Sequence, residues 1–430
     1  MILALWDEVV ALALGALKPP ADGAPTAISA IKADSRLVGP GELFVALNRG
    51  IDFVEMARAR GAATLVPDHQ EAALAALARL VRSKSSARVI AVVGSTGKTS
   101  TKDILGALCA AAVPTIWAEA SQNNEIGLPL TVCRLEPKTE VLVTEIGMRG
   151  LGQIAELCMI ARPDVVVVTS IGPEHLELVG TVERVAEANA EAIAALPAGG
   201  VAIVPADASE LEPYLQRTDI EICRFDRATI VGSDHTWTFP VGGQKLELRL
   251  PFSQRHMVEN TYAALLAYDA LGLPLECAQE GADAIVLSRW RGEERPLPGG
   301  GFVINDAYNA NPTSMRAALL DLVERAGDRR CVAILGEMAE LGRESSSYHA
   351  EVGALLGELG IQAVIAVGEA SRLFLGDGGS NDTHRFAESA AGLDPALDLL
   401  APGDAILVKA SRAVGLEGIP DLIEKRARAW

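Results

Sequence analysis

Hydrophobic positions in the middle of the chain gather in short β-branched runs separated by longer mixed segments. The runs lie at residues 89–93, 141–144, 165–169 and 201–204. Short runs of this kind are typical of buried strands, and the segments between them are long enough for helices. The alternation predicts a parallel, doubly wound sheet. A polar stretch at residues 83–88 precedes the first run, and we expect a domain boundary there.

The pattern changes on both sides of this block. Residues 232–250 alternate in short stretches around Gly242-Gly243, which predicts a small antiparallel excursion, and a helix is expected to begin near His256. A last α/β block begins near Trp290. Its strand candidates lie at residues 302–304, 332–335, 363–367 and 405–408.

The first residues are apolar but do not form a signal-peptide pattern. Asp7 and Glu8 stand where such a peptide would carry basic residues, so we expect an amphipathic first helix instead. The chain has 430 residues, more than one hydrophobic core usually serves. We therefore predict an α/β protein of three domains: a small amino-terminal α/β domain at 1–86, a central parallel-sheet domain at 87–288 and a carboxyl-terminal Rossmann-like α/β domain at 289–430.

Composition excludes several classes. The chain is 49% hydrophobic and 22% charged, as folded globular proteins are. Its 38 Lys and Arg against 56 Asp and Glu give a formal charge of −18, which argues against a nucleic-acid or anionic-membrane surface. No segment is apolar for long enough to suggest a membrane span. The six cysteines stand singly, so we expect reduced thiols in a cytoplasmic protein, with a monomer as the default.

A glycine-rich loop follows the first strand candidate and precedes a helical pattern. It reads Gly94-Ser95-Thr96-Gly97-Lys98-Thr99, followed by Ser100. In this arrangement backbone N–H groups and a helix amino end surround phosphate oxygens, Lys98 neutralises the β- and γ-phosphates, and Thr99 or Ser100 ligates Mg²⁺. The longer standard pattern would need glycine where Val92 stands, so the loop is a shortened variant. The alternative is a plain strand-to-helix turn, and the loop alone does not separate a kinase, a motor, a GTPase and a ligase.

Other sequence motifs separate these classes of nucleotide-binding protein. Residues 120–131 (ASQNNEIGLPLT) and 144–148 (TEIGM) resemble the Mur ligases, the amino-acid-adding enzymes of peptidoglycan synthesis, in sequence, order and spacing. Residues 306–315 (DAYNANPTSM) are the most specific string, while 335–342 and 408–412 are similar to the same family. The resemblance implies an ATP- and Mg²⁺-dependent ligase whose central domain binds ATP and whose first domain binds a UDP-muramoyl substrate.

The string at 306–315 favours one branch of that family. This branch joins D-alanyl-D-alanine to UDP-N-acetylmuramoyl-tripeptide through an acyl phosphate. A sibling branch adds a diamino acid to the UDP-muramoyl dipeptide and remains the alternative. A partner-stimulated P-loop switch and a nucleotide-binding scaffold without activity are further alternatives.

The resemblance also assigns roles to single residues. It implies that Glu145 and His175 hold Mg²⁺ with Thr99, and that Lys98 and Arg291 contact the γ-phosphate. A strand-end glutamate and a histidine without a metal are the alternatives. The remaining assignments are adenine for Asn260, ribose for Asp306, nucleotide or dipeptide for Asn309 and Asn311, the UDP phosphates for Ser35 and Arg36, and substrate for Asn123 and Asn124. A helix cap or a turn is the alternative for Asn260, a turn for Asn309 and Asn311, and a turn before a buried strand for Ser35 and Arg36.

The chain departs from the family at one chemically important position. Asn189 stands where members usually carry a lysine that CO₂ carbamylates to bind a second magnesium. A neutral amide lacks that charge, so we expect that Glu191 or Glu187 partly compensates or that the second metal binds weakly. Ser170 and Met257 replace asparagines, and the Asp-Gly-His piece usual after Gly50 is missing.

Overall fold

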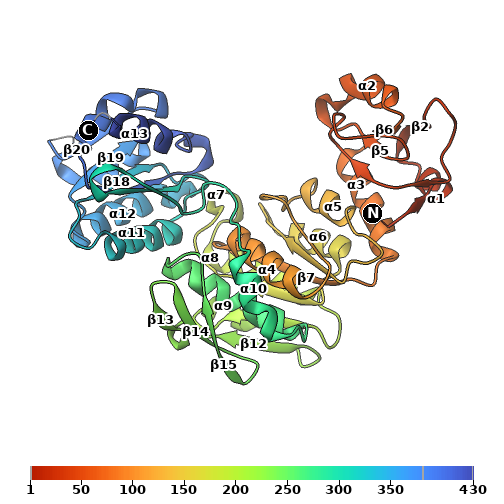
Figure 1. The fold of residues 1–430 in the computed structure, drawn as a ribbon, viewed down its shortest axis with the longest axis horizontal. Helices are drawn as coiled ribbons and strands as arrows, with labels where there is room; N and C mark the ends of the chain where they lie inside the picture. The colour runs from red at the N-terminus through yellow and green to blue at the C-terminus, as the bar shows by residue number, and fades with distance from the viewer. Residues whose placement is uncertain (1, 380–381, 429) are drawn as a thin grey trace. The chain divides into compact units, whose positions relative to one another are not determined.

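The computed structural model describes residues 2–379, 382–428 and 430, which form two compact units. Unit 1 comprises Met1–Ser170, Glu187–Ser253 and Val258–Val286, and unit 2 comprises Ile171–Ala186, Gln254–Met257 and Leu287–Trp430. Each of the three predicted domains contains a sheet of its own, so the predicted α/β class is confirmed (Figure 1). The boundaries at 86/87 and 288/289 stay a prediction.

The amino-terminal part is built on a mixed four-stranded sheet in the order β2-β6-β5-β4. A two-stranded ribbon joins β1 to β3, and three helices complete this part. The strands are β1 (Ala4–Leu5), β2 (Gly15–Lys18), β3 (Ala27–Ile28), β4 (Ile31–Lys32), β5 (Leu43–Val45) and β6 (Ala63–Pro67), and the helices are α1 (Trp6–Ala11), α2 (Val54–Ala59) and α3 (Gln70–Ser83). Leu74, Leu77 and Val81 recur on the buried face of α3, as the period of an amphipathic helix requires.

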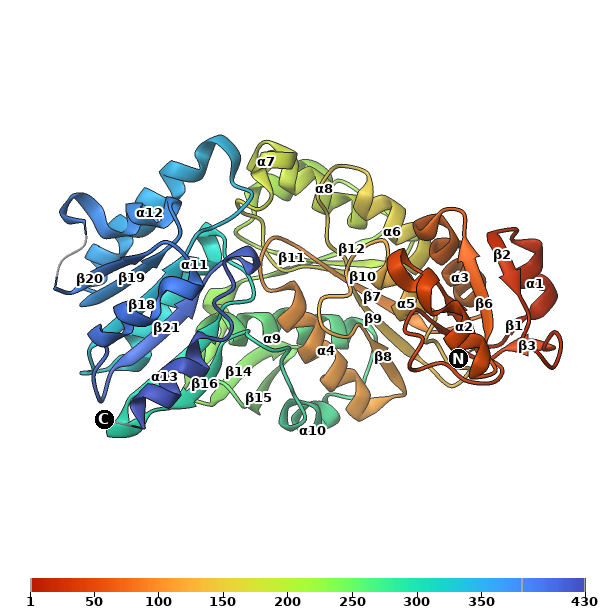
Figure 2. The same ribbon diagram turned by 90° about the horizontal axis from the view of Figure 1, so that it is seen from above.

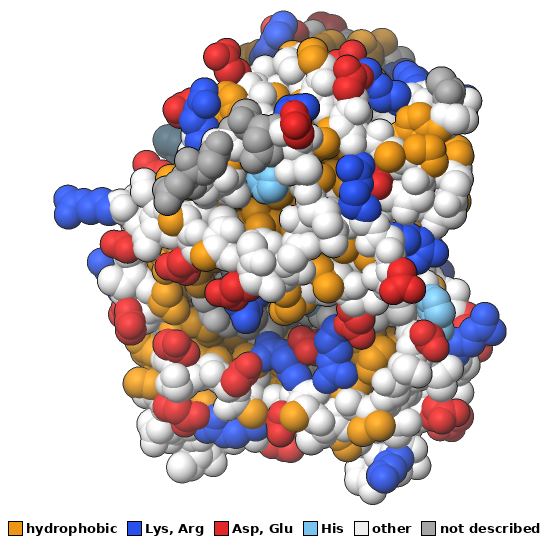
Figure 3. Space-filling view, turned by 90° about the vertical axis from the view of Figure 1, so that its left-hand side faces the viewer, with side chains coloured by type: hydrophobic (Ala, Val, Ile, Leu, Met, Phe, Trp, Pro, Cys, Tyr) orange, Lys and Arg blue, Asp and Glu red, His pale blue; other side chains and the backbone are white. Residues whose placement is uncertain are grey.

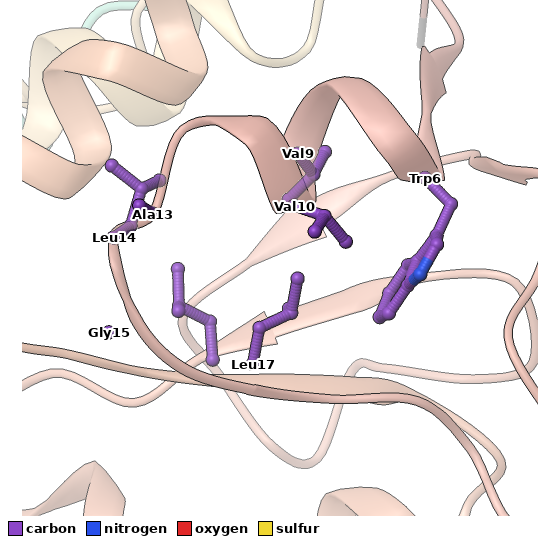
Figure 4. A pocket seen from close by; sticks show the side chains of 8 residues that line it. Trp6, Val9, Val10, Ala13, Leu14, Gly15 and Leu17 are labelled. Atoms are coloured by element: carbon purple, nitrogen blue, oxygen red, sulfur yellow. The ribbon is translucent and has the colours of Figure 1, made fainter.

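The expected first helix is present as α1 and spans only six residues. Ala13 has φ 49° and Gly15 has φ 138°, so the chain leaves the right-handed helical region and enters β2. A Cβ at Gly15 would lie 2.4 Å from the carbonyl oxygen of Val66, so glycine is required where the two strands approach. The apolar residues line a pocket of about 250 Å³ instead of a long helix face; those labelled in Figure 4 are Trp6, Val9, Val10, Ala13, Leu14, Gly15 and Leu17.

The central sheet has six parallel strands in the order β12-β11-β10-β7-β9-β8. The four predicted strands form its middle, and the edge strands β8 and β12 were not predicted. The strands are β7 (Arg88–Val93), β8 (Thr115–Trp117), β9 (Val141–Glu145), β10 (Val165–Val168), β11 (Val201–Pro205) and β12 (Glu221–Phe225). The helices in this part of the chain are α4 (Lys98–Ala112), α5 (Gly127–Val132), α6 (Gln153–Ala161), α7 (Leu176–Val179), α8 (Val182–Ala194), α9 (Arg255–Ala270) and α10 (Ala278–Asp283). Helices α4 and α10 lie on one face of the sheet and α5 and α6 on the other, as in a doubly wound fold (Figure 2).

The predicted antiparallel excursion is confirmed. It is a three-stranded sheet of β13 (Val231–Ser233), β14 (Thr236–Val241) and β15 (Gln244–Arg249). Gly242 and Gly243 connect β14 to β15 and have φ values of 60° and 72°. Two consecutive positive φ values suit the tight turns of hairpins, and glycine adopts them without a Cβ penalty. Helix α9 then begins at Arg255, next to the predicted start.

The carboxyl-terminal sheet has the order β16-β17-β21-β18-β19-β20, with β16 antiparallel and the other strands parallel. Within β18, Ala333 and Leu335 belong to a core that α11 and α12 cover. Val332 and Ile334 point into a second core, which α13 covers. The elements are β16 (Glu293–Pro296), β17 (Phe302–Asp306), α11 (Pro312–Ala326), β18 (Cys331–Gly336), α12 (Ser345–Glu358), β19 (Ala363–Val367), β20 (His384–Ala387), β21 (Ala405–Lys409) and α13 (Ile419–Ala427).

The cysteines and the surface agree with the composition. All six cysteines are free; Cys223 and Cys277 are half-buried, and the other four are buried. Burial raises the pKa of Cys109, Cys133 and Cys158 to about 12, so these thiols stay protonated. Acidic and basic side chains are interspersed on the face that Figure 3 shows. Among the described residues, no helix combines the length and apolar character needed to cross a bilayer.

Candidate functional site

The glycine-rich loop between β7 and α4 depends on its two glycines for close packing. Gly94 has φ 124°, and a Cβ there would lie 2.3 Å from the hydroxyl of Thr169. Gly97 has φ 88° and directly precedes α4, and its Cβ would lie 2.6 Å from Oδ1 of Asn260. Both positions therefore need glycine for backbone conformation and for space. Asn260, predicted to read adenine, packs against the loop from α9.

The loop is tied to the chain segment that follows β10. The backbone N–H of Ser95 donates to the carbonyl of Ser170 at 2.9 Å, and that of Thr96 donates to the hydroxyl of Ser170 at 2.9 Å. The hydroxyl of Thr169 donates to the carbonyl of Thr96 at 2.6 Å. Ser170 thus supplies both an acceptor carbonyl and an acceptor hydroxyl where the family usually has asparagine. These bonds fix the loop before any ligand binds, which lowers the entropy cost of binding.

Lys98 begins helix α4 and folds back over the loop. Its ammonium donates to the carbonyl of Gly94 and, at 3.4 Å, to that of Ser95. The partly exposed amine therefore lies at the positive end of the helix dipole, beside the first-turn N–H groups of α4. A cation and a helix amino end at one place form an anion-binding site. The buried Ser100 lies in the same first turn.

Replacing Gly94 with alanine tests this packing. We expect Gly94→Ala to lower the free energy of unfolding by roughly 2–4 kcal/mol, because strain at positive φ adds to a clash with the backbone at residues 169 and 170. Gly23→Ala is the matched control: Gly23 has φ 109° but nothing within 4 Å of its Cβ. Chemical denaturation of both variants separates the backbone strain from the steric clash. Equal losses of unfolding free energy in the two variants would show that the loop moves to accommodate the added methyl group.

Glu145 ends β9 with an unusual buried carboxylate. The residue is 1% exposed, its Oε1 accepts a hydrogen bond from Nδ2 of Asn123 at 2.8 Å, and its Oε2 has no partner among the described residues. A buried anionic oxygen without a partner is costly unless a cation compensates it. Carboxylate and hydroxyl oxygens are ligands that suit Mg²⁺. Thr99 is also buried, and its hydroxyl lies 3.3 Å from that of Ser121. The oxygens of Glu145 and Thr99 are chemically suited to Mg²⁺, and their role as its ligands stays a prediction.

The structure gives Asn124 a local role. Its Oδ1 accepts from the backbone N–H of Gly127 at 2.9 Å and of Ile126 at 3.3 Å, at the start of α5.

The described residues contain no cluster of three or more His, Cys, Asp or Glu side chains that could hold a metal. Mg²⁺ usually takes one or two carboxylates together with water and phosphate oxygens, so such a cluster is not required.

His175 belongs to unit 2, whereas Thr99 and Glu145 belong to unit 1. Its φ of 51° places it in the left-handed region directly before α7. Nδ1 is paired with the carboxylate of Glu340, and Nε2 lies 3.7 Å from Oε1 of Glu174. A carboxylate on one ring nitrogen orients a histidine and leaves the other nitrogen to a ligand, as in many metal sites. The metal role of His175 stays a prediction.

Asn189 makes a direct contact with the phosphate loop. It is 2% exposed, and its Oδ1 accepts the backbone N–H of Gly94 at 2.7 Å. Glu191, expected to compensate for the missing lysine, instead accepts the N–H groups of Gly152 at 2.5 Å and Ala155 at 3.0 Å, around the amino end of α6. Glu187 is exposed. The charge of Glu191 therefore lies at the amino end of α6. Partial compensation for the missing lysine and weak binding of a second metal both stay predictions.

Unit 2 carries the other residues assigned to the nucleotide. The guanidinium of Arg291 stacks 4.0 Å from the ring centroid of Tyr308, an arrangement typical of a cation–π contact. Asp306 ends β17, and its Oδ2 accepts a hydrogen bond from Nζ of Lys409 at 2.6 Å. The same ammonium donates to the carbonyl of Asn309 at 2.9 Å. Sequence reasoning did not single out Lys409, because the signal lies in the register of β17 against β21, which pairs it with Asp306.

The structure gives Asn311 a capping role. Its Oδ1 accepts the N–H of Ser314 at 2.8 Å, and the Ser314 hydroxyl in turn accepts the N–H of Asn311 at 3.0 Å, which forms a capping box at the start of α11. The capping role was not among the alternatives considered for this residue, which were a ligand contact and a turn. A contact with the dipeptide stays a prediction.

A buried histidine, His349, stabilises one loop of unit 2. Nε2 of His349 accepts the N–H of Met338 at 3.0 Å, and Nδ1 donates to the carbonyl of Ser345 at 2.7 Å. This pair of bonds requires a neutral imidazole and holds the 335–342 segment in place. Burial lowers the pKa of His349 and keeps it neutral. Burial likewise lowers the pKa of His256 to about 4, against the opposing effect of Asp306.

In the first domain the two residues assigned to the UDP phosphates, Ser35 and Arg36, differ in exposure. Ser35 is buried, with its hydroxyl 3.8 Å from the sulfur of Met56. Arg36 is exposed and binds both carboxylate oxygens of Asp34, which lowers the pKa of Asp34 to about 2. Their phosphate roles stay predictions.

A phosphate loop on a parallel sheet, followed by a Rossmann-like domain, agrees with the family descriptions that match this chain. The Mur ligase middle domain matches residues 92–268, and the Mur ligase, glutamate ligase domain matches residues 290–412. The chain belongs to the Mur ligase family, which confirms the predicted resemblance. It is 31% identical to the UDP-N-acetylmuramoyl-tripeptide--D-alanyl-D-alanine ligase of Escherichia coli, over 92% of this chain and 94% of that protein.

Solved structures agree. The chain resembles a crystal structure of MurF from Acinetobacter baumannii with a TM-score of 0.85 and 27% identity, covering 98% of this chain and 99% of that one. It resembles MurF ligase from Thermotoga maritima, described as a complex with ADP, with a TM-score of 0.79 and 25% identity, covering 93% and 98% of the two chains.

Proposed function

We propose that this protein is an ATP-dependent ligase that joins D-alanyl-D-alanine to UDP-N-acetylmuramoyl-tripeptide, forming ADP and phosphate in peptidoglycan precursor synthesis. The similarity to the Escherichia coli ligase, which extends over nearly the whole of both chains, carries this proposal. The ADP complex of the Thermotoga maritima protein supports ATP as the phosphoryl donor.

The reaction has two steps, and no protein nucleophile is required. A carboxylate oxygen of the tripeptide attacks the γ-phosphorus of ATP, the bond to the bridging oxygen breaks, and ADP leaves with that oxygen. The amine of D-alanyl-D-alanine then attacks the acyl carbon of the acyl phosphate. The tetrahedral intermediate expels phosphate, and the proton that the amine loses as the amide forms passes to the departing phosphate or to solvent. The main demand on the protein is to align anions that repel one another.

The residues of unit 1 meet this demand at the phosphates. The ammonium of Lys98 and the first turn of α4 offset the negative charge that the carboxylate approaches. Glu145 and Thr99 would hold Mg²⁺, which when bound withdraws charge from the phosphate oxygens. Asn260 is assigned to adenine. In unit 2, Arg291 is assigned to the γ-phosphate and Asp306 to the ribose.

The remaining assignments concern the two substrates. Ser35 and Arg36 are assigned to the UDP phosphates of the acceptor. Asn123 donates a hydrogen bond to Glu145, lies in the 120–131 string and is assigned, with Asn124, to substrate. His175 is assigned to the metal, with Glu340 orienting its ring.

An ADP-release assay tests the function. Wild-type protein is incubated with ATP, Mg²⁺ and every combination of UDP-muramoyl dipeptide or tripeptide with D-alanyl-D-alanine or a diamino acid, and product masses are measured. ADP is expected only when tripeptide and D-alanyl-D-alanine are both present. Efficient use of the dipeptide and a diamino acid would identify the sibling ligase. Hydrolysis without either cell-wall substrate would favour a P-loop switch.

The amide at position 189 leads to a prediction about CO₂. Wild-type activity is expected to be unchanged when bicarbonate is removed, because Asn189 has no amine to carbamylate. Asn189→Leu should lose roughly 1–3 kcal/mol of stability, since the buried N–H of Gly94 loses its acceptor. Asn189→Asp is the matched variant that keeps an acceptor oxygen and adds charge.

Parallel assays in degassed and bicarbonate-supplemented buffer, with Asn189→Lys included, check this expectation. Dependence on bicarbonate should appear in the lysine variant alone. Loss of wild-type activity in degassed buffer would mean that another lysine takes the modification.

A further inference from the structure

Lys409 is a lysine in the interior of unit 2. It is the last residue of β21, is 2% exposed and lies opposite Asp306 in the parallel pair β17 and β21. An ammonium group buried to this extent is costly unless it is paired and fully hydrogen-bonded. Its two acceptors are Oδ2 of Asp306 at 2.6 Å and the carbonyl of Asn309 at 2.9 Å. Both belong to the 306–315 string.

The pairing divides the two oxygens of Asp306 between different tasks. Oδ2 is held by Lys409, while the side chain as a whole is 16% exposed. Within the described residues, Oδ1 makes no hydrogen bond. The carboxylate therefore has one oxygen fixed to the protein and a second able to accept from a ligand. A carboxylate with one fixed oxygen has lost most of its rotamer freedom before binding, so less entropy is lost when the ligand arrives.

The same strand end also fixes the turn that follows Asp306. Lys409 binds the carbonyl of Asn309, and the hydroxyl of Ser411 lies 3.3 Å from the carbonyl of Ala310. The Ser411 hydroxyl also accepts the N–H of Ala339 at 2.8 Å. The 408–412 segment thus connects the 306–315 string to the 335–342 string. These three strings are far apart in the sequence but are joined by hydrogen bonds in unit 2.

We propose that Lys409 is a positioning residue for nucleotide recognition. It fixes the carboxylate of Asp306 so that the second oxygen accepts hydrogen bonds from the ribose hydroxyls, and it acts on the nucleotide through Asp306 alone. The inference rests on the proposed function, which assigns Asp306 to the ribose. It also explains why a buried charge is kept at this point of the sheet, where an apolar residue would suit the core.

A comparison of ATP with 2′,3′-dideoxy-ATP tests the proposal, because the analogue lacks the hydroxyls that Asp306 would bind. ADP release is measured with both cell-wall substrates for the wild type, Lys409→Met, Asp306→Ala and the double variant. Lys409→Met should raise KM for ATP roughly tenfold with a smaller change in kcat, as expected when a hydrogen bond to a charged group is lost. With the dideoxy analogue, the wild type and Lys409→Met should have the same KM within about twofold.

The double variant and a conservative change complete the test. The double variant should be no worse with ATP than Asp306→Ala, and Lys409→Arg should recover part of the loss. An equal rise in KM for both nucleotides would overturn the proposal and leave Lys409 a purely structural role. Calorimetric binding of ADP and its dideoxy analogue to full-length protein gives the same comparison if a variant turns over too slowly, with circular dichroism as the check on folding.

Failure of the proposed function gives a different result. Absence of ADP release by the wild type with ATP and both substrates would count against the function itself. Equal KM values for ATP and the analogue in the wild type would count against the assignment of Asp306 to the ribose, and so against the role of Lys409 that depends on it.

Discussion

Lys98→Ala is expected to lower kcat/KM for ATP by about 10²–10³-fold, the loss typical when one preorganised donor to a developing negative charge is removed. The ammonium of Lys98 contacts the loop carbonyls of Gly94 and Ser95 and lies at the amino end of α4. In the proposed reaction its charge would reduce repulsion between the γ-phosphate and the incoming carboxylate, a contribution that would grow as the acyl phosphate forms. The measurement is ADP release at saturating cell-wall substrates over a range of ATP concentrations.

The thermal midpoint of the variant shows whether the loss of activity comes from the missing charge or from unfolding. The side chain of Lys98 is partly exposed, so its truncation should change the thermal midpoint by no more than a few degrees. Lys138→Ala is the matched control, since Lys138 is 77% exposed with a single ion pair to Glu136. That variant should keep wild-type activity. Near wild-type kcat/KM in Lys98→Ala would show that the loop does not hold the reacting phosphate.

Sequence patterns predicted the interior of the fold better than its margins. Central strands such as β7, β10 and β19 are buried on both faces and therefore read as unbroken apolar runs. The edge strands β16 and β20 expose part of each side, and their mixed sequences carry no such signal. The first helix was predicted without bounds, and it is short because the neighbouring apolar residues line a pocket and form two short strands.

The site shows the same division between local and long-range information. The phosphate loop is a local string, so its glycines, Lys98 and the following helix could be predicted. The bond from Gly94 to Asn189 and the pair of Asp306 with Lys409 join residues far apart in the chain. Contacts of this kind depend on sheet register and helix placement, which no short window of sequence contains. The contact of Glu191 with the amino end of α6 could not be predicted for the same reason.

Asn189 departs from the family pattern and still satisfies the hydrogen-bonding groups around it. The amide satisfies a buried N–H of the phosphate loop and carries no charge. A carbamylated lysine would bring a carboxylate to this part of the sheet, whereas asparagine leaves Glu145 as the buried anion identified beside the loop in unit 1. The dependence of activity on Mg²⁺ should therefore be set mainly by Glu145.

Glu145→Gln is accordingly expected to lower kcat by about 10²-fold or more, because the proposed metal ligand would lose its charge while its shape is kept. The amide can still bond to Asn123, so the 120–131 segment should stay in place. Stability should not fall, since a neutral amide is less costly to bury than a carboxylate with an unpartnered oxygen. The variant should need more Mg²⁺ for half-maximal activity, which a magnesium titration of ADP release measures.

Thermal unfolding with MgADP gives a readout that is independent of turnover. Ligand that binds the folded state raises the unfolding midpoint, so the wild type should gain more from MgADP than Glu145→Gln does. Glu140→Gln is the control: Glu140 directly precedes β9 and is exposed, so its loss of charge should alter neither the midpoint nor the magnesium titration. If Glu145→Gln instead lowers stability without added ligand and keeps its magnesium dependence, the buried carboxylate supports the strand end and does not hold the metal.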